Sequence, residues 1–143
     1  MKKFVVLVLM MICSLTFAQK GPKIEFLAKD NTIDYGKVNK DLDTGIRFFE
    51  FTNTGDSPLL ITNARSSCGC TVPKPPTDPI LPGKTGKIEV KYNMNPGTIS
   101  KTITIESNAV NVENGTVNLF IKGEVFVKVE VSPLTKPKSM MDN

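Results

Sequence analysis

The sequence predicts an all-β fold, an immunoglobulin-like antiparallel β-sandwich of about seven or eight strands in a single domain. Apolar residues recur at every second position in several short runs, which is the spacing of a strand with one buried face. No run places apolar residues at helical spacing over several turns. Turn-favouring residues, among them ten glycines and ten prolines in 143 residues, lie between the runs.

The first half of the chain contains four predicted strands, at 24–28, 33–35, 46–52 and 59–62. The turn residues 53–56 separate the third strand from the fourth. A segment with five prolines follows at 73–83, and this density stiffens the chain and excludes a central strand. We interpret the segment as a rigid connection between the two sheets. A binding site for a proline-reading module is the alternative.

The second half contains three further predicted strands, at 88–92, 102–106 and 117–131. Asn114 and Gly115 predict a hairpin before the last of them, because both positions of such a turn favour positive φ. The last run would reach about 50 Å if straight, at about 3.3 Å per residue, which is too long for a compact sandwich. We therefore expect a bend at Gly123, where the missing side chain tolerates a bulge or kink.

Phe120 and Phe126 stand out in the last run because they lie at the even-numbered positions, which otherwise hold polar residues. Two aromatic side chains on a face otherwise suited to water predict a contact surface. If the register of the run holds, we expect it to be an edge strand whose unpaired backbone could also accept a partner strand. The alternative is that a bulge at Gly123 shifts the register and turns one Phe inward.

Residues 1–18 are typical of a secretory signal peptide. Lys2 and Lys3 supply its positive charge, 4–12 is an unbroken apolar run, and cleavage is expected after Ala18. The run is shorter than the about 20 apolar residues that span a bilayer. We therefore expect an exported protein, periplasmic or secreted, that does not span the membrane once the signal is removed.

Three alternatives remain for the N-terminus, namely a membrane anchor, a buried helix and lipidation of Cys13. The bulky Ile12 argues against lipidation, since lipoprotein processing needs a small residue before the cysteine. After cleavage, 19–131 is expected to form the sandwich and 132–143, which has no periodicity, a loose tail.

The composition excludes much chemistry. With no His, the chain has no Ser-His or Cys-His nucleophile pair, no imidazole base and no His metal ligand. Asp34, Asp56 and Glu89 are scattered acids whose spacing suggests no catalytic dyad. Basic and acidic residues are interspersed, without the basic stripe of a nucleic-acid-binding surface. We expect no enzymatic activity, no cofactor and no nucleic-acid partner.

Cys68 and Cys70, on either side of Gly69, form the one cluster with reactive chemistry. They could bridge each other, bind a soft metal such as Cu(I), pair between molecules or stay as buried thiols. In a straight strand their Cα atoms would lie nearly 7 Å apart and their Cβ atoms too far apart for a disulfide. Gly69 changes this, because it can adopt a turn conformation closed to other residues. Zinc would need four ligands, which the chain does not supply.

Much of the chain resembles the bacterial domain-of-unknown-function family 1573. The resemblance covers about 24–127, with a fairly specific Ser-Cys-Gly-Cys-Thr motif at 67–71. The segments that carry it are 33–38, 49–61, 67–73, 79–88, 103–108 and 121–125. It implies an exported sandwich similar to the immunoglobulin-like domains of the PapD, major-sperm-protein and ASH group. It implies no known catalytic activity or cofactor.

Two function hypotheses follow. The first is a non-catalytic, exported binding or scaffolding module that contacts a protein partner or a second copy of itself through an exposed strand or loops. Phe120 and Phe126 are its candidate interface residues. The alternative is a periplasmic thiol or Cu(I)-binding protein that uses Cys68 and Cys70.

Overall fold

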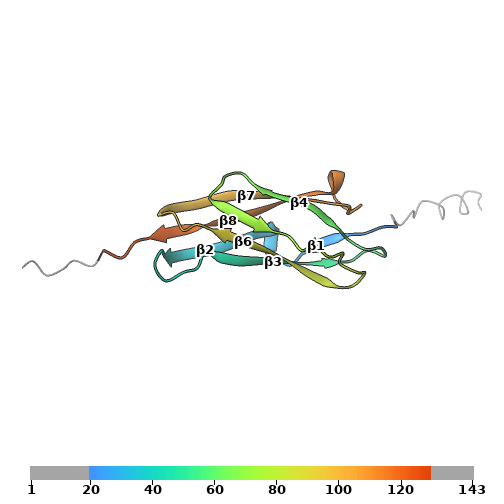
Figure 1. The fold of residues 1–143 in the computed structure, drawn as a ribbon, viewed down its shortest axis with the longest axis horizontal. Helices are drawn as coiled ribbons and strands as arrows, with labels where there is room; N and C mark the ends of the chain where they lie inside the picture. Colours follow the sequence, from blue (N-terminus) through green and yellow to red (C-terminus); the bar gives the residue numbers. More distant parts are fainter. Residues whose placement is uncertain (1–19, 130–143) are drawn as a thin grey trace, which may run out of the picture.

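The computed structural model describes residues 20–129, which form an elongated domain with residues 20 and 129 at opposite ends of its long axis (Figure 1). The expected signal peptide at 1–18 and the expected tail at 132–143 lie outside the described residues, so both stay predictions. The strands are β1 (Ile24–Phe26), β2 (Thr32–Asn39), β3 (Ile46–Asn53), β4 (Ile61–Ser66), β5 (Thr71–Lys74), β6 (Thr85–Tyr92), β7 (Gly97–Ser107) and β8 (Thr116–Phe126). Two short 3-10 segments, η1 (Lys29–Asn31) and η2 (Glu113–Gly115), precede β2 and β8.

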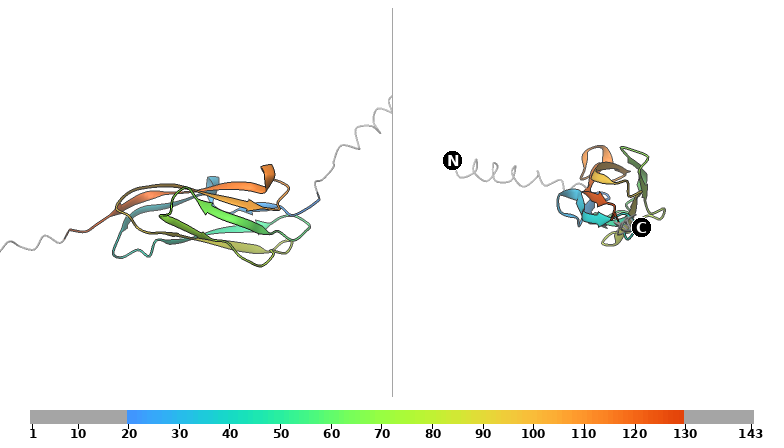
Figure 2. Two further views of the ribbon diagram at one scale, coloured as in Figure 1. Left: turned by 45° about the horizontal axis from the view of Figure 1, so that its top comes forward. Right: turned by 90° about the vertical axis from the view of Figure 1, so that its left-hand side faces the viewer.

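The eight strands form two four-stranded sheets packed as two layers (Figures 1 and 2). Sheet A has the order β1-β3-β6-β5, and sheet B has the order β2-β8-β7-β4. All neighbouring strands are antiparallel except β2 and β8, which are parallel. The predicted immunoglobulin-like sandwich is confirmed, with this one parallel pair as the exception to its antiparallel pairing.

The core lies between the sheets and follows the period-2 alternation of the sequence. Along β6, Ile88 and Val90 are fully buried, while Lys87 and Lys91 point outward and are exposed. The largest fully buried apolar side chains come from both sheets and are Phe49, Phe51, Leu59, Ile88, Val90, Ile99, Ile103, Ile105, Leu119 and Ile121.

The proline-rich segment behaves differently from the prediction. Its first residues belong to β5, a strand the sequence did not reveal because it contains Pro73. Residues 75–84 then lead to β6 in the same sheet, so the predicted connection between two sheets is wrong. The chain crosses from sheet B to sheet A in residues 67–70, which lie just before β5 and the proline-rich segment.

The bulge expected at Gly123 is not found in β8, whose register against β7 is continuous across this residue, and the irregularity lies instead on the neighbouring strand β2. The register of β2 against β8 shifts between Asp34 and Lys37. A Cβ on Gly123, whose φ is +149°, would lie 2.8 Å from Cβ of Tyr35 and 2.9 Å from the carbonyl oxygen of Gly36. The missing side chain therefore lets the bulged strand approach β8.

The register of β8 holds across Gly123, so Phe120 and Phe126 both face outward and are 43% exposed. The predicted exposure of both side chains is confirmed. The prediction that the strand is an edge is wrong, because β8 lies between β2 and β7 and pairs with both. Its backbone groups are used on both sides, which leaves none for a partner strand.

Candidate functional site

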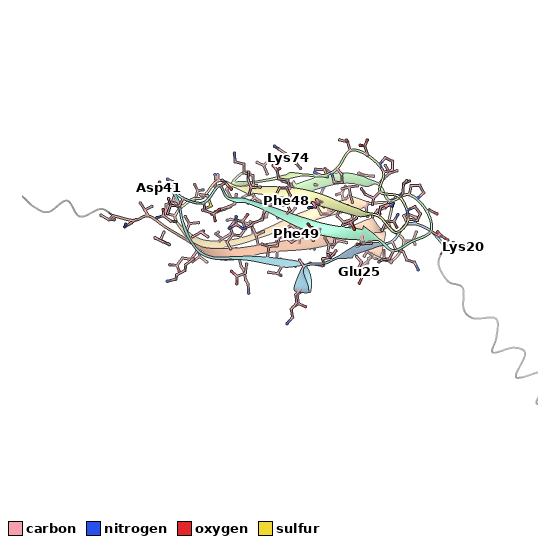
Figure 3. All side chains as sticks on the ribbon, turned by 90° about the horizontal axis from the view of Figure 1, so that it is seen from below. Lys20, Glu25, Asp41, Phe48, Phe49 and Lys74 are labelled. Carbon is pink, nitrogen blue, oxygen red and sulfur yellow. A yellow bond between two sulfur atoms is a disulfide. The ribbon has the colours of Figure 1, made fainter. Side chains whose placement is uncertain are left out.

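The outer face of sheet A carries an exposed aromatic residue beside a buried one. Phe48 and Phe49 are consecutive on β3, so the pleat sends them to opposite faces (Figure 3). Phe49 is fully buried in the core, whereas Phe48 is 51% exposed. Phe48 is thus more exposed than Phe120 or Phe126. The sequence reasoning did not single it out.

Phe48 belongs to a band of exposed or half-buried apolar side chains, which we call the apolar strip. It consists of Leu27, Ile46, Phe48 and Val72. Ile46 and Val72 flank Lys91 in one cross-strand row, and the Leu27 amide donates to the Glu50 carbonyl at 3.0 Å, next to Phe48 along β3. The strip therefore crosses the outer face of sheet A from the β1 side to β5, with Lys91 lying between Ile46 and Val72 and Glu89 lying opposite Phe48.

Charged pairs interrupt and border the strip. Nζ of Lys74 lies 3.5 Å from Oε1 of Glu89, and Nζ of Lys87 lies 2.9 Å from Oε1 of Glu50. Both pairs are on the outer face of sheet A and contribute little to stability, because solvent screens them. Apolar and aromatic side chains interspersed with charged ones are found on protein-binding surfaces.

Both edges of sheet A are protected against strand addition. The Asn111 side chain accepts the Ile24 amide N–H and donates to the Ile24 carbonyl, each at 2.9 Å, so it occupies the free edge of β1. At the opposite edge, β5 is short and contains Pro73, which has no N–H to donate. These features direct a partner of sheet A to its face rather than to its edges.

The Cys-Gly-Cys element forms the turn by which the chain passes from β4 to β5. Of the four states that the sequence left open, the structure shows the bridge between Cys68 and Cys70, with Cα atoms 5.4 Å apart. Gly69 does not adopt the left-handed conformation, and a Cβ there would meet no atom within 4 Å. The expectation that the turn depends on a conformation special to glycine is therefore wrong.

In the bridged form neither sulfur is a thiolate, so the element offers no soft anionic ligand to Cu(I). Among residues 20–129, no group of three or more acidic or cysteine side chains is arranged to hold a metal ion. Both cysteines are partly exposed, and Cys70 packs against the core.

Replacing both Cys68 and Cys70 with Ser is expected to leave a folded sandwich, destabilised by about 1–3 kcal/mol. The bridge closes a loop with one residue inside it, so it restricts the unfolded chain little, and the core carries the fold. Urea denaturation of the variant measures the loss, with Thr62→Ser on β4 as a control. A variant that does not fold would contradict this prediction.

The interface residues predicted from sequence lie on the other face of the molecule and apart from each other. Phe120 and Phe126 are six residues apart on β8, which places them about 20 Å apart along the strand. Phe120 is paired with Thr32 and Thr102, and Phe126 with Asn39, so the cross-strand partners of both are polar. They do not form one apolar patch.

Phe126→Ser is expected to change the free energy of unfolding by less than about 1 kcal/mol, because the side chain is 43% exposed at the end of β8. The neighbouring Val125 is 2% exposed, and Val125→Ser provides the buried comparison. Chemical denaturation of both variants distinguishes the two positions. A loss of several kcal/mol for Phe126→Ser would show that this residue is part of the core.

The scattered acids serve as local contacts. Asp34 and Glu89 pair with lysines of neighbouring strands, at 3.5 Å from Lys122 and Lys74 respectively. Asp56 accepts the Gly21 amide N–H at 2.7 Å, and this hydrogen bond lowers the pKa of its carboxyl. The three acids lie on different elements, so the structure brings together no catalytic dyad from them.

A buried polar cluster closes one end of the sandwich. The hydroxyl of Tyr35 donates to the Gly45 carbonyl at 2.9 Å, and burial raises the pKa of Tyr35 to about 12. The Arg47 guanidinium stacks on the Tyr35 ring, 4.2 Å from its centroid, and holds both carboxylate oxygens of Asp43 at 3.1 and 2.7 Å. This hydrogen bonding lowers the pKa of Asp43 and orders the loop before β3.

The comparisons place this chain among known proteins. The family model DUF1573, described as a protein of unknown function, matches residues 26–125, well over half of the chain. The chain belongs to the DUF1573 family. The DUF1573 match confirms the resemblance found in the sequence. A comparison with curated proteins finds no match.

Solved structures share the fold of this DUF1573 domain at low sequence identity. A protein of unknown function from Porphyromonas gingivalis W83 has a TM-score of 0.61 and 20% identity, over 78% of this chain and 50% of that one. The ASH/PapD-like domain 7 of human CEP192 has a TM-score of 0.57 and 11% identity, over 80% of this chain and 95% of that one.

A third similar structure is the secreted serine protease VesC of Vibrio cholerae, with a TM-score of 0.50 and 17% identity, over 72% of this chain and 23% of that one. The DUF1573 chain thus spans half of the Porphyromonas protein and less than a quarter of VesC. At these identities the likeness shows the fold alone. Within residues 20–129, no helix is long and apolar enough to cross a membrane.

Proposed function

We propose that this DUF1573 domain is a non-catalytic protein-binding module of an exported protein, and that its partner contacts the outer face of sheet A. The observation that carries the proposal is Phe48, half exposed at the centre of the apolar strip. Aromatic side chains at the centre of a face, with charged residues around them, are typical of the residues that dominate binding energy.

A protein partner fits this face better than a small molecule does. Small-molecule sites are concave and enclose most of the ligand. The face of a sheet is instead broad, and the groove beside the strip, lined by Glu25, Phe26, Leu27, Thr52 and Thr54, is open. Such a groove suits a side chain that projects from a larger partner.

The same proposal excludes Phe120 and Phe126 as the main contact. Each is a single aromatic side chain among polar neighbours, and each is less exposed than Phe48. Single exposed apolar residues are normal on protein surfaces, whereas a band of them is not. Export of the module rests on residues 1–18, which are typical of a signal peptide.

Co-purification from the native host tests the proposal with three tagged versions of the protein: wild type, Phe48→Ser and Phe120→Ser. We expect a defined protein to be recovered with wild type and with Phe120→Ser, and to be reduced at least about tenfold with Phe48→Ser. The matched Phe120 variant controls for loss of one exposed aromatic residue. Equal recovery with all three versions, or loss with Phe120→Ser alone, would overturn the assignment of this face.

A further inference from the structure

The disulfide between Cys68 and Cys70 has the features of a redox-active disulfide rather than of a structural one. It lies in a turn between two sheets, encloses only Gly69, and both cysteines are partly exposed. A bridge over one residue restricts the unfolded chain little, so its formation adds little to folding. Opening it therefore leaves the strands and core in place.

Thr71 supplies the second observation. This residue is only 3% exposed, and its hydroxyl oxygen lies 4.0 Å from Sγ of Cys68 and 3.9 Å from Sγ of Cys70. These two sulfurs are the only hydrogen-bond partners of the Thr71 hydroxyl within the described residues. A buried hydroxyl normally has a strong acceptor, and a disulfide sulfur is a weak one.

The hydrogen bond from the Thr71 hydroxyl to sulfur becomes stronger when the disulfide is reduced. A thiolate is an anionic acceptor, so a hydroxyl beside it gains a charge-assisted hydrogen bond. The Thr71 hydroxyl therefore favours the reduced form over the bridged form. A disulfide whose reduced form is stabilised is an oxidant toward other thiols.

We propose that the Cys68–Cys70 disulfide, with the buried Thr71 hydroxyl as its positioning group, is a dithiol–disulfide exchange site that oxidises dithiols. The substrate class is a pair of thiols, carried either by a polypeptide or by a small molecule. Each protein molecule oxidises one dithiol. The proposal is independent of the binding face around Phe48.

The exchange proceeds in two balanced steps. A substrate thiolate attacks Sγ of Cys68, a mixed disulfide forms, and Cys70 leaves as a thiolate beside the Thr71 hydroxyl. Both cysteines are half-buried, and Cys70 is taken as the leaving group because it packs against the core. The second substrate thiolate then attacks the substrate sulfur of the mixed disulfide and releases Cys68. Two electrons pass from the dithiol to the protein, one thiol proton ends on Cys68, and the other is released to solvent while Cys70 stays a thiolate beside the Thr71 hydroxyl.

Equilibration in glutathione redox buffers tests the role of Thr71, with the reduced fraction measured by thiol alkylation and intact mass. We expect Thr71→Val to shift the equilibrium toward the disulfide by about fivefold, or about 20 mV for a two-electron couple. Thr71→Ser keeps the hydroxyl and is expected to stay within about twofold of wild type. Thr104→Val, on the outer face of sheet B, is the control and should have no effect. An unchanged equilibrium in Thr71→Val would overturn the role of the hydroxyl.

Oxidation of dithiols by wild-type protein tests the site without any variant. The probes are dithiothreitol and a synthetic peptide with two cysteines between apolar residues. Each should be oxidised by one equivalent of protein, and near-UV circular dichroism should show the tyrosine environment retained in the reduced protein. If the peptide reacts faster than dithiothreitol, the substrate is a polypeptide. If the two rates are equal, the substrate is a small dithiol. Failure to oxidise either probe, or unfolding on reduction, would overturn the proposal.

Discussion

Replacing Phe49 with alanine is expected to destabilise the domain by about 3–5 kcal/mol, whereas the same change at Phe48 should cost about 1 kcal/mol. Phe49 is fully buried, and its ring packs edge-on against Phe26 with centroids 6.5 Å apart. Its removal leaves a cavity between the sheets. Phe48 is half exposed, so alanine removes less buried surface and creates no enclosed cavity.

The two neighbouring variants form their own control, since they change the same residue type on the same strand. Urea denaturation followed by near-UV circular dichroism of Tyr35 and Tyr92 measures both, because the chain has no tryptophan. Equal losses would contradict the assignment of the two faces of β3. If Phe48→Ala loses little stability, a binding defect of a Phe48 variant cannot be attributed to unfolding.

The Asn53→Ala variant is also expected to lose about 3–5 kcal/mol, because a fully buried amide joins three segments of the chain. Nδ2 donates to the carbonyls of Ser57 and Ile80, each at 2.8 Å. Oδ1 accepts the amide N–H groups of Lys23 and Gly55, at 3.3 and 3.0 Å. Alanine removes the side-chain partner of the Ser57 carbonyl and of the Lys23 and Gly55 amides, whereas the Ile80 carbonyl still accepts the Leu59 amide N–H at 2.8 Å.

Asn63→Ala on β4 provides the matched control for Asn53. Asn63 is exposed, and its side chain makes one long contact of 3.4 Å with Glu106. Its loss should change stability by less than about 0.5 kcal/mol. Chemical denaturation of both variants checks the difference. Similar small effects at both positions would show that the amide of Asn53 does not hold these loops.

The strands with one apolar face could be predicted from the sequence because their alternation is a local signal. The run around Ile88 and Val90 predicted both a strand and its buried face, and the parity of Phe120 and Phe126 predicted their exposure. The position of β8 between β2 and β7 could not be predicted. Strand order depends on pairings between residues far apart in the sequence, which no local pattern encodes.

The candidate site was harder to predict than the fold. Along β3, Ile46, Phe48, Phe49 and Phe51 place apolar side chains on both faces, so alternation alone does not indicate which aromatic residue is exposed. Asn53 was interpreted as a turn residue, because its partners Lys23 and Ile80 are 30 and 27 residues away. Thr71 gave no signal, since its importance lies in its burial beside the two sulfurs.

Site-specific photocrosslinking in the native host tests the central claim most directly. A photoreactive side chain is placed at position 48 in one version of the full-length protein and at position 120 in another. Both positions are exposed aromatic sites, on the outer faces of sheet A and sheet B respectively. The account predicts a discrete crosslinked protein at position 48, at least about tenfold more abundant than at position 120. A discrete partner crosslinked at position 120 and absent at position 48 would contradict it.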